Sequence, residues 1–270
     1  MATASTTATG RVRVRTGGSD GWLRIAAPVV VGAVVLGGWQ FLVSVVGVSE
    51  YLLPSPASIL EQFVAFAPAI LSATLITGTN ALIGLVVGSV LGILLAALAS
   101  RWSALDMMSA PVVASLAVIP IVALAPVLNS MFGADSQFGR QAIAALASFV
   151  PVFLNTLRGF RQVIPVHRDL MAAYAAGGTQ ILRTVTLPTA VPFIFTGIRI
   201  ASSLAVISAL VAEYFGGPRG GLGGLISTSA ATSAYALAWA FVFAAILLGL
   251  LFFLATLLLE RLVVRRPHGA

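Results

Sequence analysis

Six apolar runs, each long enough to cross the hydrocarbon core of a bilayer, constrain the fold of this chain more than any other feature. A helix needs about 20 apolar residues for that crossing. Backbone groups in lipid must find hydrogen-bond partners within their own segment, so each run is predicted to be a helix. The runs are roughly 25–48, 70–99, 108–130, 140–158, 191–213 and 234–260. They predict an all-α integral membrane protein of about six transmembrane helices.

Composition supports this class and excludes others. Of the 270 residues, 59% are hydrophobic and 9% charged, whereas a soluble domain carries about 25% charged residues. Cysteine is absent and the only histidines are His167 and His268, so we expect no metal site and no cofactor. The sequence contains no paired carboxylates and no Ser-His-Asp set, so we expect no catalytic residue. It also lacks lysine, which the phosphate-binding P-loop requires.

The arginines predict the orientation of the chain. All 15 basic residues are arginine, and they lie at the ends of apolar runs, which favours membrane topology over nucleic-acid binding. With the N-terminus inside, thirteen of them face the cytoplasm and only Arg140 and Arg219 lie outside. We therefore expect a multi-pass membrane protein with both termini cytoplasmic. Its parts would be a disordered tail, a transmembrane domain and a second tail, at 1–20, 21–262 and 263–270.

Three features between and within the runs are informative. Segment 49–69 contains an amphipathic stretch, Ala57–Phe66, which predicts a helix at the membrane interface. The glycine-rich segment 214–233 is interpreted as a flexible turn. Gly84, Gly88 and Gly92 lie four residues apart and predict close packing against a neighbouring helix.

Polar residues inside membrane helices are costly, so they are candidates for function. Asn80, Asn155 and Glu213 are the candidates for the substrate pathway. Glu213 could line a gate at the outer end of its helix, or it could be an interfacial carboxylate that reaches water. Asn155 could instead make a hydrogen bond between helices. Arg199 is expected to extend to the cytoplasmic interface.

The longest inner loop, 159–190, is predicted to form a helical hairpin. A first helix covers 166–176, with Asp169 in its first turn, where the helix dipole favours a carboxylate. Gly177-Gly178 is expected to stop it. Thr179 caps a second helix at 180–187, which Pro188 ends. The hairpin could insert into a groove on another protein, or it could pack on its own bundle.

The residues of this loop resemble those of permease subunits of type I ATP-binding cassette (ABC) importers. Leu187-Pro188 and the following Thr189–Pro192 are similar to the end of the family signature, whereas Asp169 and Ala175 replace its Glu and Gly. The resemblance covers about 50–262 and is strongest in the nitrate, sulfonate, taurine, pyrimidine-precursor and riboflavin permeases. Further similar stretches are Ile119–Pro126, Phe132-Gly133, Phe149–Gly159, Ala212-Glu213 and Gly221–Gly223.

The resemblance implies the permease domain of a transport subunit in the bacterial inner membrane, which works with other chains. Expected partners are two ABC ATPase subunits, an extracytoplasmic substrate-binding protein, and a second permease chain that is identical or a sister. The loop would be the coupling helix, through Asp169, Ala172, Ala173, Ala175, Gly177, Gly178, Leu187 and Pro188. The solute would be a pyrimidine precursor, a riboflavin-like heterocycle, or an anion such as a sulfonate, nitrate or taurine. An ion-gradient-driven secondary transporter and a membrane enzyme are the alternatives.

Overall fold

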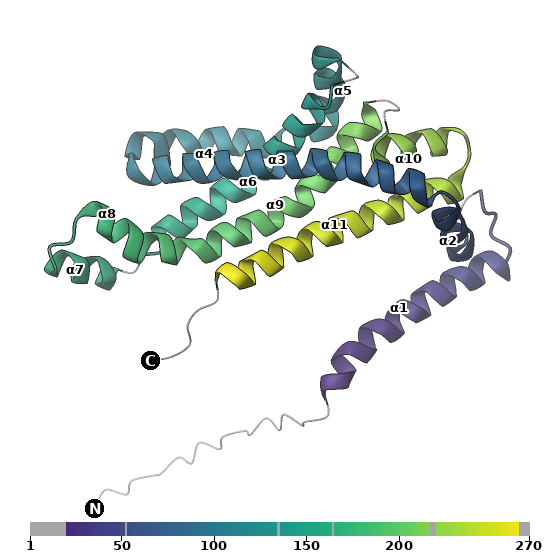
Figure 1. Cartoon of the computed structure of the whole chain (residues 1–270), viewed down its shortest axis with the longest axis horizontal. Helices are drawn as coiled ribbons and strands as arrows, with labels where there is room; N and C mark the ends of the chain where they lie inside the picture. The colour runs from purple at the N-terminus through teal and green to yellow at the C-terminus, as the bar shows by residue number, and fades with distance from the viewer. Residues whose placement is uncertain (1–19, 52, 134–135, 164, 217–219, 265–270) are drawn as a thin grey trace, which may run out of the picture.

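Long helices stacked side by side make up the core of the computed structural model (Figure 1), which describes residues 20–51, 53–133, 136–163, 165–216 and 220–264. Helices α3, α6, α9 and α11 form the bundle, and the principal contacts join α3 to α6 and α6 to α9. These four helices are Ala67–Arg101, Phe138–Arg161, Leu187–Phe215 and Tyr235–Val263. The all-helical prediction is confirmed for the residues that the structure describes.

Five helices of the described chain are long and apolar enough to cross a membrane. They correspond to five of the six predicted runs; the N-terminal one covers Ala26–Ser44 within α1 (Asp20–Ser44). The run 108–130 is not one straight helix. It is divided into α4 (Ser103–Val118) and α5 (Ile121–Phe132), and the two parts meet at an angle of 94°.

The break between α4 and α5 follows from Pro120. Proline disfavours the helical conformation in the residue before it, and Ile119 is indeed extended, with φ −62° and ψ 122°. Pro120 itself, at φ −73° and ψ 107°, is also non-helical. If the bent pair counts as one span, the described chain has six.

Two glycine seams hold the bundle together. A Cβ on Gly84 or Gly88 of α3 would lie closer than 3.0 Å to the backbone or side chains of α6, and one on Gly92 would lie 3.1 Å from the Phe149 carbonyl oxygen. The packing predicted for these three glycines is therefore confirmed. A second seam joins α6 to α9, where a Cβ on Gly197 would lie 3.0 Å from the Pro151 carbonyl oxygen.

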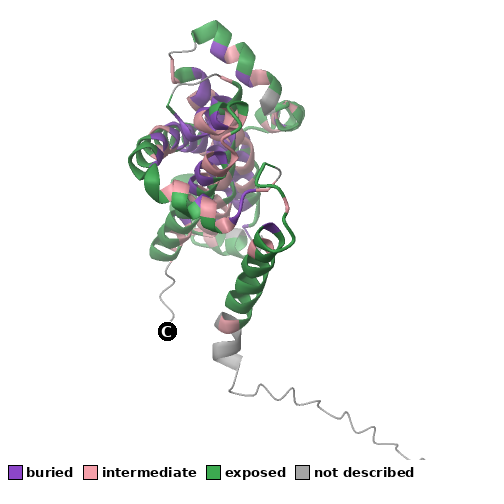
Figure 2. Cartoon of the chain, turned by 90° about the vertical axis from the view of Figure 1, so that its right-hand side faces the viewer, coloured by how far each residue is buried: buried purple, intermediate pink, exposed green. Residues whose placement is uncertain are grey.

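The N-terminal helix α1 lies apart from the bundle and is exposed along most of its length (Figure 2). Two contacts hold the C-terminal part of α1. Trp39 packs edge-on against Trp239 of α11, and Gln40 Oε1 accepts a hydrogen bond from the Ala57 amide. That amide belongs to α2 (Pro56–Ala65), which Ser55 caps and which packs on α11. The predicted helix at Ala57–Phe66 is thus present.

The glycine-rich segment is not a flexible turn throughout. Leu222–Ala231 forms a regular helix, α10, with Gly221 at its N-cap. Gly220 has φ +80°, a conformation that suits glycine, at the point where the chain enters this helix. At ten residues α10 is too short to span a bilayer.

The predicted tails fall largely outside the described residues. Residues 1–19 and 265–270 are not described, and the described chain begins in helix at Asp20 and leaves helix after Val263.

Candidate functional site

The hairpin predicted at 159–190 is present at one end of the bundle (Figure 1). Its first helix, α7, covers Pro165–Ala173 and is shorter than the predicted 166–176. Its second part begins with α8 (Gly178–Ile181) and continues without interruption through a π-helical turn, η1 (Leu182–Thr186), into α9. The predicted second helix is therefore the start of a membrane helix and not a separate element.

The turn of the hairpin is built on Ala175 and not on the glycines. Ala175 has φ +50°, and its amide donates to the Ala172 carbonyl, while the Ala176 amide donates to the Met171 carbonyl. These two bonds form a Schellman motif, in which the left-handed residue is usually glycine. The expectation that Gly177-Gly178 stops α7 is therefore wrong: the left-handed position is where the family signature has its Gly.

Gly177 serves a different local role. It has extended backbone, with φ −70° and ψ 159°, and it occupies the N-cap position of α8 that was predicted for Thr179. A Cβ on Gly177 or Gly178 would meet nothing within 4 Å. Nothing within the described chain therefore requires glycine at these two positions.

Pro188 does not end a helix, because it lies at the start of α9 directly after the π turn. A proline within a helix clashes with the carbonyl four residues earlier, which here belongs to Thr184. The π turn widens the backbone over this residue, so the chain passes through Pro188 without a break.

Asp169 lies outside the first turn of α7, since the helix begins at Pro165. The ion pairs of the described residues do not include Asp169. Around Asp169 the hairpin exposes large apolar side chains, with Val166 68%, Leu170 52% and Tyr174 76% exposed. Ala172, Ala173, Ala175, Gly177, Gly178, Leu187 and Pro188 are also exposed. The hairpin thus has a free apolar surface, which is typical of a site for another protein.

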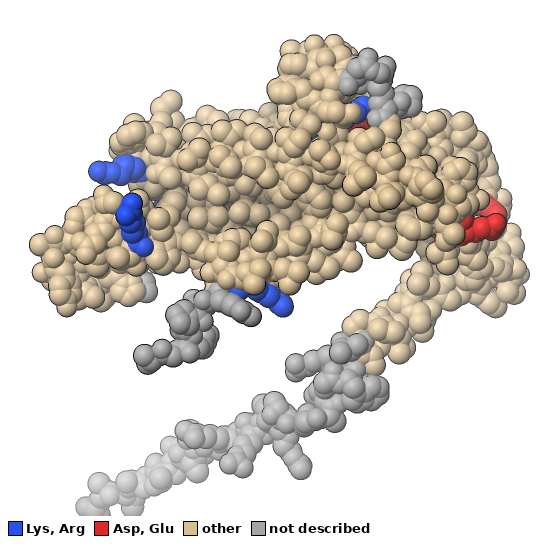
Figure 3. Space-filling view, in the orientation of Figure 1, with Lys and Arg blue, Asp and Glu red and all other residues tan. Residues whose placement is uncertain are grey.

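Charge also distinguishes the two ends of the molecule. Figure 3 shows basic side chains gathered at the end that carries α7 and α8, and acidic side chains at the opposite end, beside α1 and α2. Two ion pairs connect helices in the basic half: Asp106 of α4 with Arg161 of α6, and Arg199 of α9 with Glu260 of α11. Arg199, expected to extend to the cytoplasmic interface, is half-buried and has its Nη1 3.0 Å from Glu260 Oε2.

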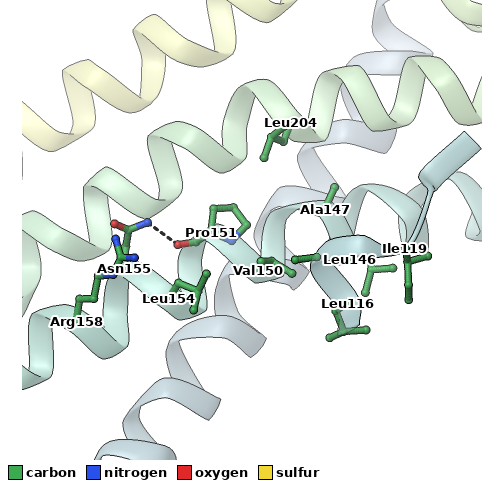
Figure 4. A pocket seen from close by; sticks show the side chains of 11 residues that line it. Leu116, Ile119, Leu146, Ala147, Val150, Pro151, Leu154, Asn155, Arg158 and Leu204 are labelled. Atoms are coloured by element: carbon green, nitrogen blue, oxygen red, sulfur yellow. Dashed lines mark hydrogen bonds between the residues drawn. The ribbon is translucent and has the colours of Figure 1, made fainter. Parts of the chain in front are cut away.

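Asn155 lies in the wall of a cavity of about 400 Å³ between α4, α6 and α9 (Figure 4). Its Nδ2 donates to the Pro151 carbonyl at 2.8 Å, within α6. The side-chain amide thus bonds its own helix; the predicted alternative of a bond between helices is not what the structure has. Arg158 lines the same cavity beside Asn155, and the remaining wall is apolar, from Leu116, Ala117, Ile119, Leu146, Ala147, Val150, Pro151, Leu154 and Leu204.

Asn80 and Glu213 lie together, far from the hairpin, and both are 1% exposed. Glu213 Oε1 accepts from Asn80 Nδ2 at 3.2 Å, and Oε2 accepts from Thr77 Oγ1 at 2.7 Å. The alternative in which Glu213 reaches water is therefore wrong for this structure. A solute has no access to either side chain in this conformation.

Sequence reasoning missed the partners of this pair. Thr77, Gln137, Arg140 and Gln141 complete the same hydrogen-bonded group. Arg140, expected on the outer side of the membrane at the first residue of its run, is 1% exposed within α6. The one available signal was the arginine at the first residue of the predicted apolar run 140–158.

Comparison with a protein family agrees with this architecture. The family model for the binding-protein-dependent transport system inner membrane component matches residues 88–268. This match includes the hairpin, the Asn155 cavity, Glu213 and α10.

Similar individual proteins are permeases. The riboflavin transport system permease protein of Chloroflexus aurantiacus is 35% identical over 90% of this chain and 91% of its own. The formylaminopyrimidine transport permease protein of Halalkalibacterium halodurans is 32% identical over 67% of this chain and 72% of its own. Among solved structures, an amino acid ABC transporter matches with a TM-score of 0.61 and 15% identity, over 73% of this chain and 95% of that one. This last similarity concerns the fold alone.

Proposed function

The chain belongs to the binding-protein-dependent transport system inner membrane components, and from this premise we propose how it acts as the permease subunit of an ABC importer. It forms the translocation pathway and is not itself an enzyme. ATP is hydrolysed by a separate ATPase chain, and an extracytoplasmic binding protein delivers the solute. A second permease chain completes the pathway.

The exposed apolar hairpin carries this proposal. Val166 and Leu170 of the short helix α7, and Tyr174 directly after it, are exposed at the end of a membrane bundle. If that end lies in the cytoplasm, contact with lipid does not explain this apolar exposure. A groove on the ATPase would bury them, as a groove buries one face of a helix in other complexes. Because α8 continues through η1 into α9, a push on the hairpin would pass directly into a membrane helix.

The distribution of charge supports the orientation that this mechanism needs. Cytoplasmic loops are enriched in arginine, and the basic end of the molecule is the end that carries the hairpin (Figure 3). We therefore propose that this end, with the N- and C-termini, lies in the cytoplasm of the inner membrane.

The cavity beside Asn155 is the proposed part of the pathway within this chain. Its volume of about 400 Å³ is in the range of small-molecule sites. A mostly apolar wall with one amide and one guanidinium suits a heterocycle with polar edges better than a small, fully hydrated anion. The riboflavin and formylaminopyrimidine relatives support a heterocyclic solute.

Reconstitution in proteoliposomes tests the function. The permease, the ATPase chain and the binding protein are combined, and uptake of radiolabelled riboflavin and of a formylaminopyrimidine is measured with and without ATP inside. We expect ATP-dependent uptake that Tyr174→Asp and Leu170→Asp abolish. Gln180→Asp is the control, because Gln180 is an exposed residue of α8 that is already polar. Uptake that persists without ATP and without the ATPase would favour an ion-gradient-driven transporter.

A further inference from the structure

Four elements meet at the α10 end of the bundle in a polar cluster, here called the buried polar cluster. Thr77, Asn80, Arg140 and Glu213 are buried in it, and Gln137 and Gln141 are half-buried. The cluster comprises Thr77 and Asn80 of α3, Gln137, Arg140 and Gln141 at the start of α6, Glu213 of α9, and the first amides of α10. Gln137 Oε1 accepts from Asn80 Nδ2 at 2.9 Å and from Arg140 Nη1 at 2.8 Å. Asn80 Nδ2 also reaches Glu213, so bonds run unbroken from the arginine to the carboxylate.

Within this cluster Glu213 holds the N-terminus of α10. Its Oε2 accepts from the Gly223 amide at 3.2 Å, and Thr77 Oγ1 accepts from the Leu222 amide at 2.9 Å while donating to the same carboxylate. The first amides of a helix have no partner within it, and the helix dipole favours a negative charge there. Glu213 therefore supplies a hydrogen-bond acceptor and a negative charge at the N-terminus of α10, where the helix itself has neither.

The approach is close enough to require glycine on the α10 side. A Cβ on Gly221 would lie closer than 3.0 Å to the Glu213 carboxylate, and a Cβ on Gly223 would come equally close to the Leu210 carbonyl oxygen. Both glycines have φ outside the left-handed region, so the contact itself is what excludes a side chain. Gly221 and Gly223, interpreted from the sequence as part of a flexible turn, are therefore points of close contact between α10 and α9.

Arg140 supplies the opposite charge. It is 1% exposed, and its Nε is buried with no partner. An isolated buried charge is strongly unfavourable unless an opposite charge compensates it. Glu213 is the other buried charged side chain of the described chain, and the hydrogen bonds of Gln137 and Asn80 connect Arg140 to its carboxylate.

We infer that Glu213 and Arg140 are a charge-compensating pair of positioning residues that fixes α10 to α3, α6 and α9 through the buried polar cluster. The pair is neutral as a unit, so it is tolerated in the membrane, while either member alone is not. The four elements then form one unit at this end of the molecule, and α10 keeps a fixed place while the hairpin end moves. The consequence for transport rests on the proposed function; the consequence for stability does not.

A double-mutant cycle, in which each charged side chain is replaced by an uncharged one, tests the pair. Glu213→Gln, Arg140→Met and the double variant are purified in detergent, and melting is followed by intrinsic tryptophan fluorescence. We expect each single variant to lower the melting temperature by roughly 10 °C, because a lone buried charge remains. We expect the double variant to recover at least half of that loss. Additive losses in the double variant would overturn the inference.

Milder variants keep the test informative if a single variant does not fold. Thr77→Ser retains the hydroxyl that bridges Glu213 and Leu222, and Thr77→Val removes it without changing shape greatly. We expect Thr77→Ser to melt close to the wild type and Thr77→Val to melt several degrees lower. Equal melting temperatures for Thr77→Ser and Thr77→Val would show that the Thr77 hydroxyl does not position α10. Glu260→Gln, which removes the less buried carboxylate opposite Arg199, is the control and should cost less than Glu213→Gln.

Uptake assays separate positioning from contact with solute. For a positioning pair, the double variant should regain the uptake rate per folded complex, with the wild-type KM. If Glu213 instead contacts the solute, the double variant would fold but would still show a raised KM, and the inference would fail. The melting experiments need no partner chain, so they hold even if the reconstituted system does not transport.

Discussion

Ala175 shows how a single residue departs from the family pattern without changing the shape of the turn. The left-handed conformation that it adopts costs a residue with a Cβ about 1–2 kcal/mol relative to the right-handed one, and the Schellman hydrogen bonds hold it there. The turn has therefore stayed in place even though the glycine is missing. The glycines that follow are not a replacement for it.

Ala175→Gly should stabilise the hairpin. Glycine removes the strain at φ +50°, and we expect a gain of about 1 kcal/mol. Hydrogen-exchange mass spectrometry of the purified chain should show amides of α7 exchanging about fivefold more slowly. The control is Ala173→Gly, at the last residue of α7, which should speed exchange because glycine lowers helix propensity. Faster exchange in both variants would contradict the left-handed assignment.

Gly88 is the tightest point of the contact between α3 and α6. A Cβ there would overlap the Ala145 carbonyl oxygen, which belongs to backbone and cannot rotate away. Gly88→Ala should therefore destabilise the chain by about 1–3 kcal/mol, as overpacking does, seen as a lower melting temperature in detergent. Gly78→Ala is the matched control on the same helix, since its Cβ would lie 3.4 Å from the end of Leu248. If Gly88→Ala lowered the melting temperature no more than Gly78→Ala does, α3 and α6 would be able to move apart at Gly88 without a loss of stability.

The glycine seam could be predicted from the sequence and the polar cluster could not, for a physical reason. Gly84, Gly88 and Gly92 belong to one helix, so their spacing alone places them on one face. Thr77 and Asn80 bond a carboxylate 136 and 133 residues away, and such pairings depend on how helices pack. Asn80, Asn155 and Glu213 were therefore recognised as unusual, while their surroundings were not.

At the scale of elements, the predicted helix bounds differ from the structure most clearly at prolines. Pro120 breaks a predicted span, whereas Pro188, predicted to end a helix, lies in a continuous one. The difference is the π turn before Pro188, which makes room for the ring. Five of the six spans were predictable because length and apolarity suffice to define them, but a π turn leaves no clear pattern in the sequence.

Pro188→Ala should alter the coupling between hairpin and membrane helix. Alanine restores an amide that can bond the Thr184 carbonyl, so we expect η1 to relax to α-helix and rotate the hairpin by about 100°, the turn of one residue. Uptake per ATP hydrolysed in the reconstituted importer should fall about tenfold, with the chain still inserted. Pro192→Ala, in α9 beyond the π turn, is the control and should retain coupling. An unchanged ratio in Pro188→Ala would exclude a role for the π turn in transmitting force.

At the scale of the whole molecule, the two ends of the bundle differ in the way that an importer requires. One end carries the exposed hairpin and basic side chains (Figure 3). The other holds its helices together through the buried polar cluster. Force would enter at the first end, and the second end would retain its internal geometry while the helices tilt. This division depends on the hairpin facing the cytoplasm.

The absence of cysteine allows that orientation to be measured directly. Tyr174→Cys places a thiol on the hairpin, and Glu61→Cys places one on α2 at the opposite end; both side chains are exposed. A membrane-impermeant maleimide added to spheroplasts should label only Glu61→Cys, and inside-out vesicles should reverse the pattern. The cysteine-free parent controls for background, and labelling after detergent confirms that each thiol is reactive. Labelling of Tyr174→Cys from the outside would put the hairpin beyond the reach of any cytoplasmic ATPase and refute the mechanism.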